Sequence, residues 1–401
     1  MSAYGIEGLK WIKGPREQLP FSMDEYERRL KQVRRVMEER GIDVLLVNDS
    51  SNICYLTGHA YPSYLFAQAI VPRGPEKGVT IVCSEVDLGV VTDSTWVRDI
   101  RTWPQEKDVF PGDYVKVILK EKSLDDKTIG YQLASGQLPP STYLKFREIL
   151  PEAKFVEASD IVTSIQYVKS PKEIEYCREA AKLAETGAEA GIDAIREGVT
   201  EREIAFAISK ALYEHGSEYR SGFCLASGPN TASLHHSPTT RKIRKGDLVT
   251  MEPIGNCLYY HCTILRTAAL GSPSKKAKDL HRVAMEALIE GTKMIRPGVT
   301  MESVEEVTRE VAAKYGYEKY RCHRVGFSMG RMGMIASDLE HSMYGLMKGE
   351  KSLIKPGMIF TIEPNFADLE ERIGILLGNN VLVTETGCEP LYELPLDLVE
   401  K

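Results

Sequence analysis

The chain has 401 residues, with 51 Lys and Arg against 57 Asp and Glu and a formal net charge of −6 at pH 7. No stretch concentrates charges of one sign, which argues against a nucleic-acid track or a membrane-docking face and favours a small-molecule partner. A chain of this length is too long for one ordinary hydrophobic core, so we expect two domains.

The lack of a membrane-span or signal-peptide pattern and the spacing of the cysteines predict a reducing compartment. No apolar run approaches the roughly 18 to 20 residues of a membrane span, and residues 1–20 lack the basic-then-apolar pattern of a signal peptide. The eight cysteines are scattered without Cys-x-x-Cys spacing, which argues against a disulfide framework and a zinc knuckle. We therefore expect a cytoplasmic protein.

The first part of the chain alternates between helical and strand patterns. Apolar residues between Met23 and Arg40 recur every three or four positions and are followed by Gly41, which predicts an amphipathic helix with a glycine stop. Short apolar runs at 42–47, 67–71 and 79–83 predict buried strands. Residues 1–165 are therefore predicted to form an α/β domain.

Residues 166–401 show a different pattern, in which paired helices are followed by strands. Ser170-Pro-Lys-Glu173 and Thr200-Glu-Arg-Glu203 are capping-box sequences, which predict helices ending near Arg196 and Gly216. Strand patterns follow at 248–251 and 259–265. The same order then returns, with helices predicted at 276–295 and 300–315 and a strand at 358–362.

The turns between the paired helices indicate a duplication. Arg196-Glu-Gly-Val-Thr200 and Arg296-Pro-Gly-Val-Thr300 share Arg, Gly, Val and Thr at an offset of 296 − 196 = 100 residues. This favours a repeated unit of two helices and an antiparallel sheet, with a pseudo-two-fold axis and a site between the halves. The alternative is that Gly-Val-Thr before a helix is only favourable turn and cap chemistry.

Two glutamates stand where apolar strands end. Glu252 follows Val-Thr-Met and Glu363 follows Phe-Thr-Ile, and each precedes a proline. A carboxylate beside a buried strand is costly unless it is paired or functional. The duplication would bring the two together, so that one is protonated while the other stays charged. The alternative is that each only satisfies a neighbouring Arg or backbone amide.

Histidine is the usual proton carrier near neutral pH, and the chain has eight. His235 lies in the loop after Ser227-Gly-Pro-Asn-Thr231, and His323 precedes the segment that ends at Arg331. Both are therefore placed beside the other candidate segments. With Glu252 and Glu363 they form the predicted catalytic set.

Several motifs resemble the creatinase/aminopeptidase P/prolidase family. They are Asn52-Ile-Cys-Tyr-Leu-Thr-Gly58, Lys169-Ser-Pro-Lys-Glu-Ile-Glu175, Ser227-Gly-Pro-Asn230 with His235, Lys245-Gly-Asp-Leu-Val249, Arg266-Thr267, Lys355-Pro-Gly-Met358 with Ile362-Glu-Pro364, and Val381-Leu-Val-Thr-Glu-Thr-Gly387. The resemblance implies an α/β N-terminal domain and an α+β C-terminal domain of the pita-bread fold, with two duplicated halves. It also implies a homodimer.

Metal-using members of that family hold two divalent ions with five residues. Those positions fall on Glu252, Thr263, His323, Glu363 and Gly378 in this chain. Thr and Gly supply no negative charge for hard divalent ions, so the resemblance predicts that no metal pair is bound and no cofactor is needed. A single weakly held ion on Glu252, His323 and Glu363 is the remaining metal alternative.

The chain looks closer to the branch that includes creatinase, which works without metal, and ectoine hydrolase. Tyr259-Tyr-His-Cys262 with Arg266-Thr267 is similar to ectoine hydrolase, and the histidine that matches His235 is the general acid/base of creatinase. The resemblance, with the loop sequences, suggests substrate contacts from Tyr64, Phe66, Tyr260, His261 and Arg331. Leu265 replaces a creatinase carboxylate and Gly330 replaces a second peptidase histidine, so creatine and peptides are both disfavoured.

The predicted function is hydrolysis of a C–N bond in a small nitrogen-rich solute. His235 would take a proton from water and return it to the leaving nitrogen, while Glu252 and Glu363 hold a cationic group. His323 and His261 would donate hydrogen bonds to the developing oxyanion. The first alternative is a metal-dependent Xaa-Pro dipeptidase with an atypical centre. The second is an inactive pita-bread binding module.

Overall fold

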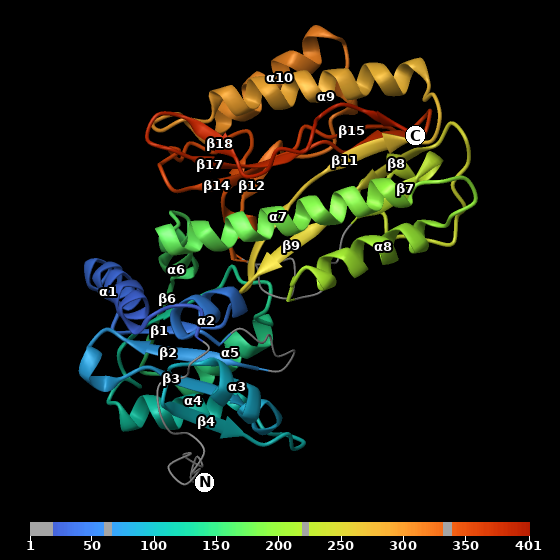
Figure 1. Ribbon diagram of the computed structural model, residues 1–401. Coiled ribbons are helices and arrows are strands. Elements are labelled where there is room, and N and C mark those ends of the chain that lie inside the picture. The colour runs from blue at the N-terminus through green and yellow to red at the C-terminus, as the bar shows by residue number, and fades with distance from the viewer. Residues whose placement is uncertain (1–18, 60–65, 219–223, 332–338) are drawn as a thin grey trace. The chain divides into compact units, whose positions relative to one another are not determined.

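The computed structural model describes residues 19–59, 66–218, 224–331 and 339–401 (Figure 1). The chain divides into two compact units, Met1–Gln166 with Arg331–Met343 and Tyr167–Gly330 with Tyr344–Lys401. The predicted domains were continuous in sequence, so the grouping of Arg331–Met343 with the N-terminal unit differs from that prediction. Its physical basis includes a hydrogen bond of 3.0 Å from Ser51 Oγ to the Arg331 carbonyl. No helix in the described part of the chain is long and apolar enough to span a membrane.

A six-stranded sheet forms the centre of the N-terminal unit, in the order β4-β3-β2-β1-β5-β6. Its strands are β1 (Val44–Val47), β2 (Gln68–Pro72), β3 (Thr80–Ser84), β4 (Asp99–Trp103), β5 (Thr128–Tyr131) and β6 (Lys154–Glu157). Its helices are α1 (Met23–Glu39), α2 (Ser50–Thr57), α3 (Leu88–Ser94), α4 (Pro111–Glu121), α5 (Pro140–Ile149), α6 (Ser159–Gln166) and α11 (Leu339–Met343). Strand β1 pairs antiparallel with β2 and parallel with β5, so the sheet is mixed.

The first helix and the first strand match the pattern read from the sequence. Leu30, Val33 and Met37 of α1 are buried. Gly41 follows with a φ of 66°, and the Ile42 amide donates to the Met37 carbonyl at 2.8 Å. A left-handed residue that closes the last turn is the usual glycine stop of a helix. The predicted α/β class of this unit is confirmed.

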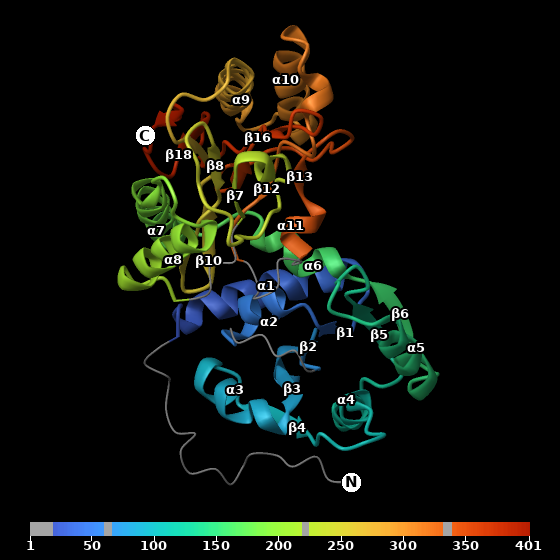
Figure 2. The same cartoon turned by 90° about the vertical axis from the view of Figure 1, so that its right-hand side faces the viewer.

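The C-terminal unit contains two helix pairs and two larger sheets. The helices are α7 (Pro171–Ala194), α8 (Glu201–Glu214), α9 (Lys275–Met294) and α10 (Met301–Lys314). One sheet has the order β19-β11-β8-β7 and the other has the order β13-β12-β14-β17-β18. Helices α7 and α8 pack against each other, as do α9 and α10, and each pair lies along one side of the sheets (Figures 1 and 2).

The strands of this unit are short. The first sheet contains β7 (Leu225–Ser227), β8 (Leu248–Met251), β11 (Arg266–Ala269) and β19 (Val399–Glu400). The second contains β12 (Gly326–Ser328), β13 (Gly345–Leu346), β14 (Ile359–Ile362), β17 (Asn379–Val383) and β18 (Cys388–Pro390). Two hairpins complete the unit, β9 (Ile254–Cys257) with β10 (Tyr260–Thr263) and β15 (Phe366–Asp368) with β16 (Ile373–Ile375).

Both predicted capping boxes are present. The Ser170 side chain accepts from the Glu173 amide, and the Thr200 side chain accepts from the Glu203 amide. In each case the glutamate side chain returns the bond to the cap residue's own amide, at 2.8 Å. These local bonds fix where α7 and α8 begin.

The duplication is confirmed in the backbone. The Gly198 amide donates to the Ile243 carbonyl at 2.9 Å, and the Gly298 amide donates to the Ile354 carbonyl at the same 2.9 Å. The two glycines have φ angles of 84° and 83°. The same turn therefore closes on the same neighbouring segment in both halves, which turn chemistry alone would not require.

The two sheets meet at one isolated bridge. Strand β8 pairs Met251 with Arg266, and strand β14 pairs Ile362 with Asn379. The residues that precede Arg266 and Asn379 bond to each other, with the Leu265 amide 3.2 Å from the Gly378 carbonyl and the Gly378 amide 3.1 Å from the Leu265 carbonyl. This reciprocal pair joins equivalent positions, so it lies at the pseudo-two-fold axis.

Candidate active site

The strand ends beside this bridge position the two predicted glutamates. The Glu252 amide donates to the Cys224 carbonyl at 2.9 Å, and the Glu363 amide donates to the Val325 carbonyl at 2.7 Å. These bonds are equivalent in the two halves, because β7 and β12 run beside β8 and β14 in the same register. The duplication therefore brings two carboxylates to one place, as predicted.

The two carboxylates affect each other's ionisation. Burial, together with the negative charge of Glu252, raises the pKa of Glu363 well above its usual value. Burial also raises the pKa of Glu252, against hydrogen bonds from Cys224 and Thr263 that lower it. Two acids that disfavour each other's charge share a proton more readily than isolated acids. The pair is therefore able to hold a proton at a higher pH than an isolated glutamate.

His323 is fixed by the second half of the unit. Its Nδ1 lies 2.5 Å from the Arg324 carbonyl, and its Nε2 lies 3.2 Å from Asn365 Nδ2. A carbonyl requires a donor, so these contacts assign the proton to Nδ1 and leave Nε2 as the acceptor. Burial lowers the pKa of His323, which keeps the ring neutral at physiological pH.

Asn365 links this histidine to the carboxylate pair. Its Nδ2 also lies 3.3 Å from Glu363 Oε2, and its Oδ1 accepts from the Leu377 amide at 3.0 Å. His323 Nδ1 is 4.0 Å from Glu363 Oε1. Sequence reasoning missed Asn365, although its position two residues after Glu363 was visible in the chain. Its role depends on the fold of the loop, which spacing alone does not give.

His235 lies in the loop after the short 3-10 helix Gly228–Ala232, and its side chain is exposed. Its positive charge, when protonated, lowers the pKa of both Glu252 and His323. It is therefore near both groups. All four predicted catalytic residues belong to the C-terminal unit, and each is linked electrostatically to at least one other member of the set.

The residues present do not fit a pair of divalent ions. Thr263 Oγ1 donates to Glu252 Oε1 at 3.3 Å, and the Thr263 amide donates to Asn380 Oδ1 at 2.7 Å. A Cβ built on Gly378 would lie 2.9 Å from Glu363 Cβ, so no larger side chain enters there without a shift. In the described ranges no three His, Cys, Asp or Glu side chains are placed to hold a metal ion. The donor set is short of the carboxylates that hard divalent ions require.

The predicted substrate contacts fall in different places. Tyr260 is fully buried and its hydroxyl donates to Glu173 Oε1 at 2.8 Å, so its side chain holds the hairpin to α7 and does not join the carboxylate pair. His261 is 4% exposed, with Nδ1 3.1 Å from the Tyr259 carbonyl. Phe66 packs on Phe146 within the N-terminal unit, with ring centroids 6.3 Å apart.

Arg331, which is also predicted to contact substrate, belongs to that same unit. Arg331 is buried, and its guanidinium contacts the Cys54 thiol. Burial raises the pKa of that thiol, against the charge of the arginine. Tyr64 lies outside the described residues.

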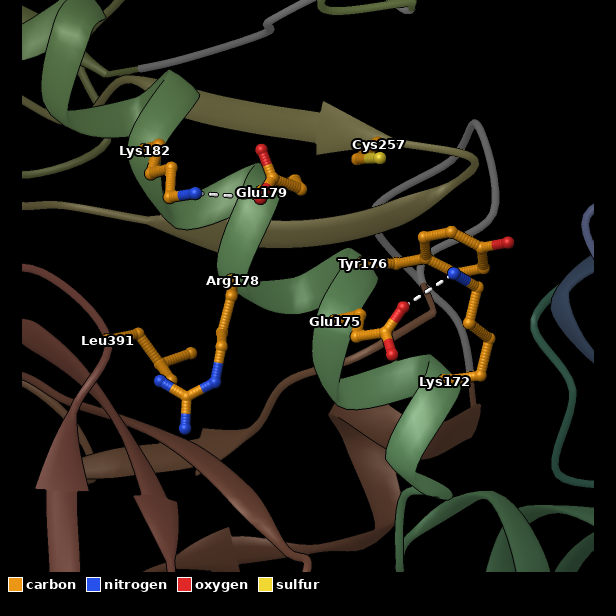
Figure 3. Close-up of a pocket in the computed structure, with 8 residues that line it drawn as sticks. All are labelled: Lys172, Glu175, Tyr176, Arg178, Glu179, Lys182, Cys257 and Leu391. Carbon is orange, nitrogen blue, oxygen red and sulfur yellow. Dashed lines mark hydrogen bonds and ion pairs between the residues drawn. The ribbon is translucent and has the colours of Figure 1, made fainter.

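An open cleft of about 340 Å³ lies along α7 (Figure 3). Its lining residues are Lys172, Glu175, Tyr176, Arg178, Glu179, Lys182, Cys257 and Leu391. Its charges are largely paired, with Lys172 Nζ 2.5 Å from Glu175 and Lys182 Nζ 2.7 Å from Glu179. It contains none of the predicted site residues.

Known proteins resemble the chain over nearly its whole length. An Xaa-Pro dipeptidase from Pyrococcus horikoshii is 25% identical over 380 residues, covering 94% of this chain and 100% of the relative. The ectoine hydrolase of Halomonas elongata is 26% identical over 400 residues, covering 96% and 99%. A crystal structure of prolidase from Thermococcus sibiricus superposes with a TM-score of 0.84 at 26% identity, covering 95% and 100%.

Family models divide the chain where its two units meet in sequence. The Creatinase/Prolidase N-terminal domain matches residues 29–168, and metallopeptidase family M24 matches residues 175–385. The relatives named above are hydrolases, which disfavours the inactive binding module. The chain belongs to the M24 family and is a hydrolase with a creatinase-type N-terminal domain and a pita-bread C-terminal domain.

Proposed function

We propose that the chain hydrolyses a C–N bond of a small nitrogen-rich molecule with a proton-sharing glutamate pair and a histidine, and without a metal pair. The observation that carries this proposal is the environment of Glu252 and Glu363. Glu363 is buried, Glu252 is half-buried, and the charge of Glu252 helps to raise the pKa of Glu363. Thr263 and Gly378 stand where further acids would be needed for two divalent ions.

A pair that shares one proton carries one negative charge in a partly dry site. A cationic amidinium or ammonium group between the two carboxylates would compensate that charge and favour full ionisation of both. Binding of such a group would therefore release a proton. This favours substrates that are positively charged near the bond to be broken.

His235 is the base in this proposal. An exposed imidazole can take a proton from water and return it to the leaving nitrogen, which makes that nitrogen a better leaving group. His323 takes a different role from the one predicted for it, because its Nε2 accepts from Asn365 and has no proton to offer an oxyanion. We assign His323 and Asn365 to positioning Glu363.

Metal removal tests the proposal. Purified protein is dialysed against a chelator and assayed on cyclic amidine solutes, guanidino acids, N-acyl diamino acids and Xaa-Pro dipeptides, with and without added Mn²⁺. We expect turnover of one nitrogen-rich solute that survives chelation and does not rise with Mn²⁺. Two tightly bound divalent ions per chain, required for all turnover, would contradict the proposal.

The second candidate is a metal-dependent Xaa-Pro dipeptidase, and the relatives favour it over hydrolysis of a solute. Two Pyrococcus relatives carry that name, at 25% and 26% identity, whereas one relative is an ectoine hydrolase. Its minimal centre would be a single ion held by Glu252, His323 and Glu363, and these three side chains would have to rearrange to hold it. Cleavage of Xaa-Pro dipeptides that appears only after Mn²⁺ or Co²⁺ is added would establish this candidate.

A further inference from the structure

The β9–β10 hairpin of the C-terminal unit has two chemically different faces. Cys262 Sγ contacts the Cys177 carbonyl at 3.2 Å, and a Cβ on Gly255 would lie 2.0 Å from the Ala180 carbonyl, so this face is closed against α7. Thr263 lies on the opposite face and bonds to Glu252. Side chains alternate along a strand, and directly paired residues share a face. The face of Thr263 therefore belongs to the candidate active site.

Asn256 lies on this second face. It is paired with His261, two residues along β10 from Thr263, which places it roughly 7 Å further along the hairpin. Asn256 is 1% exposed, and within the described residues neither its Nδ2 nor its Oδ1 has a hydrogen-bond partner. A buried side-chain amide normally bonds through both atoms. Asn256 departs from this, as Asn48 and Gln68 of the N-terminal unit do, but Asn256 lies on the hairpin face that Thr263 shares with Glu252.

The turn of the hairpin is also unusual. Leu258 and Tyr259 both have positive φ angles, 48° and 66°, in a two-residue connection that favours Asn and Gly. The Leu258 amide donates to Glu218 Oε2 at 2.8 Å and helps to hold this turn. Backbone strain of this kind persists where the surrounding fold imposes it, and it is frequent beside functional sites. The two-residue turn fixes the register of the hairpin, in which Asn256 is paired with His261.

We propose that Asn256 binds a neutral group of the substrate that carries an N–H donor and a carbonyl acceptor together, such as a carboxamide, and so sets substrate choice. This proposal rests on the proposed function and adds a second recognised group to it. An amide side chain pairs with such a group through both of its atoms at once. The backbone of an Xaa-Pro dipeptide has an ammonium, a tertiary amide and a carboxylate, and none of these groups by itself carries an N–H donor beside a carbonyl acceptor. Asn256 therefore favours a carboxamide over the backbone groups of an Xaa-Pro dipeptide.

Two matched compounds test this recognition. N-acetylglutamine and N-acetylnorleucine share the same acyl amide and differ in whether the side chain ends in a carboxamide. We expect the full-length protein to bind N-acetylglutamine at least about tenfold more tightly by calorimetry, and Asn256→Leu to remove that preference. Equal binding of the two compounds, or binding of neither, overturns the proposal. Failure to hydrolyse either compound bears on the proposed function alone, because binding is measured separately.

Thermal stability separates recognition from a structural role. Replacing an unpartnered buried amide with leucine should raise the melting temperature by roughly 2–4 °C. The matched control is Asn52→Leu, because Asn52 is also 1% exposed but accepts from Gln166 Nε2 at 2.7 Å. That substitution should lower the melting temperature. A fall for Asn256→Leu as large as for Asn52→Leu would mean that Asn256 stabilises the fold, and would overturn the proposal.

Discussion

The two halves of the C-terminal unit share a backbone and differ in their side chains. Equivalent amides of Glu252 and Glu363 make equivalent bonds to the neighbouring strands, and the turns before α8 and α10 close in the same way. At the bridge that joins the halves, however, one residue is Leu265 and the other is Gly378. The duplicated backbone places the functional groups, and the divergence of side chains makes them unequal.

That inequality appears in the two carboxylates. Glu363 is 6% exposed and is bonded to Asn365, whereas Glu252 is partly exposed and bonded to Thr263. The charge of Glu252 contributes to the raised pKa of Glu363, and the charge of His235 lowers the pKa of Glu252. We therefore expect Glu363 to be the protonated member of the pair and Glu252 to be the charged one.

The largest effect should come from the histidines of the two halves. His235→Ala should lower kcat by about 10²- to 10⁴-fold, because it removes the proposed proton carrier. The side chain is exposed, so the melting temperature should change little. Steady-state kinetics on the substrate found in the screen, with circular dichroism on the same samples, measures both.

The control is His215→Ala, an exposed histidine that follows α8 and contacts the Ala211 carbonyl. It should keep full activity, because it lies among none of the proposed catalytic groups. His323→Ala should lose activity and also shift the pH profile, because it positions Glu363 through Asn365. Near-normal turnover by His235→Ala would refute its role as the base.

The bridge positions should give the next largest effect. Leu265 is 1% exposed, and Leu265→Ala should cost about 2–5 kcal/mol of unfolding free energy through lost contacts and a cavity. Gly378→Ala should cost about 1–3 kcal/mol, because its Cβ would lie 2.9 Å from Glu363 Cβ and 2.9 Å from a methyl of Leu265. Urea denaturation measures both losses.

The double substitution sharpens this test. In Leu265→Ala with Gly378→Ala, the new methyl at 378 gains space that the leucine has left, so the combined loss should be smaller than the sum of the single losses. Strict additivity would mean that the two positions do not compete for one volume. The contact between Leu265 and Gly378 would then not explain why the two halves differ at the pseudo-two-fold axis.

A smaller effect should appear in the pH dependence of stability. The folded pKa of Glu363 lies above its usual value of 4.5, so the folded state binds this proton more tightly than the unfolded state. Its contribution to stability is therefore fully present below pH 4.5 and is lost as the pH rises towards the folded pKa, by roughly 1.4 kcal/mol per pH unit. Urea denaturation across this range measures it.

Substitution of each carboxylate in turn separates the contributions of Glu252 and Glu363 to the pH dependence of stability. Glu363→Gln should flatten the decline of the unfolding free energy with rising pH, because no proton is lost at that position. Glu252→Gln should narrow the pH range over which the unfolding free energy declines, because the charge that raises the Glu363 pKa is gone. An unchanged pH dependence in Glu252→Gln would show that the two groups do not interact.

Local sequence signals predicted more of the fold than of the site. Capping boxes at Ser170 and Thr200 depend on residues three positions apart, so they could be read directly. The pairing of Glu252 with Glu363 followed from the repeat. The bond from Tyr260 to Glu173, by contrast, joins residues 87 positions apart, and no pattern in the chain reveals it.

The same limit explains the other differences. Asn365 bonds to both His323 and Glu363 because of a loop conformation, and Arg331 is grouped with the N-terminal unit although residues on both sides of 331–343 belong to the C-terminal one. In the sequence Asn256 is an ordinary hairpin residue. Only the structure shows that it is buried and that its side-chain amide has no partner among the described residues. Functional polar residues of this kind depend on tertiary neighbours, which periodicity and spacing do not specify.

The smallest predicted effect compares the caps of the second helix in each half. Thr200 accepts from the Glu203 amide and donates to Glu203 Oε2 at 2.6 Å, whereas Thr300 makes no side-chain cap bond and instead contacts Ser303 Oγ at 2.8 Å. Thr200→Ala should therefore cost about 1 kcal/mol of unfolding free energy, and Thr300→Ala only a few tenths. Urea denaturation of both variants measures the difference. Equal losses would mean that the caps are energetically equivalent, and that the halves diverge at the axis but not in their helices.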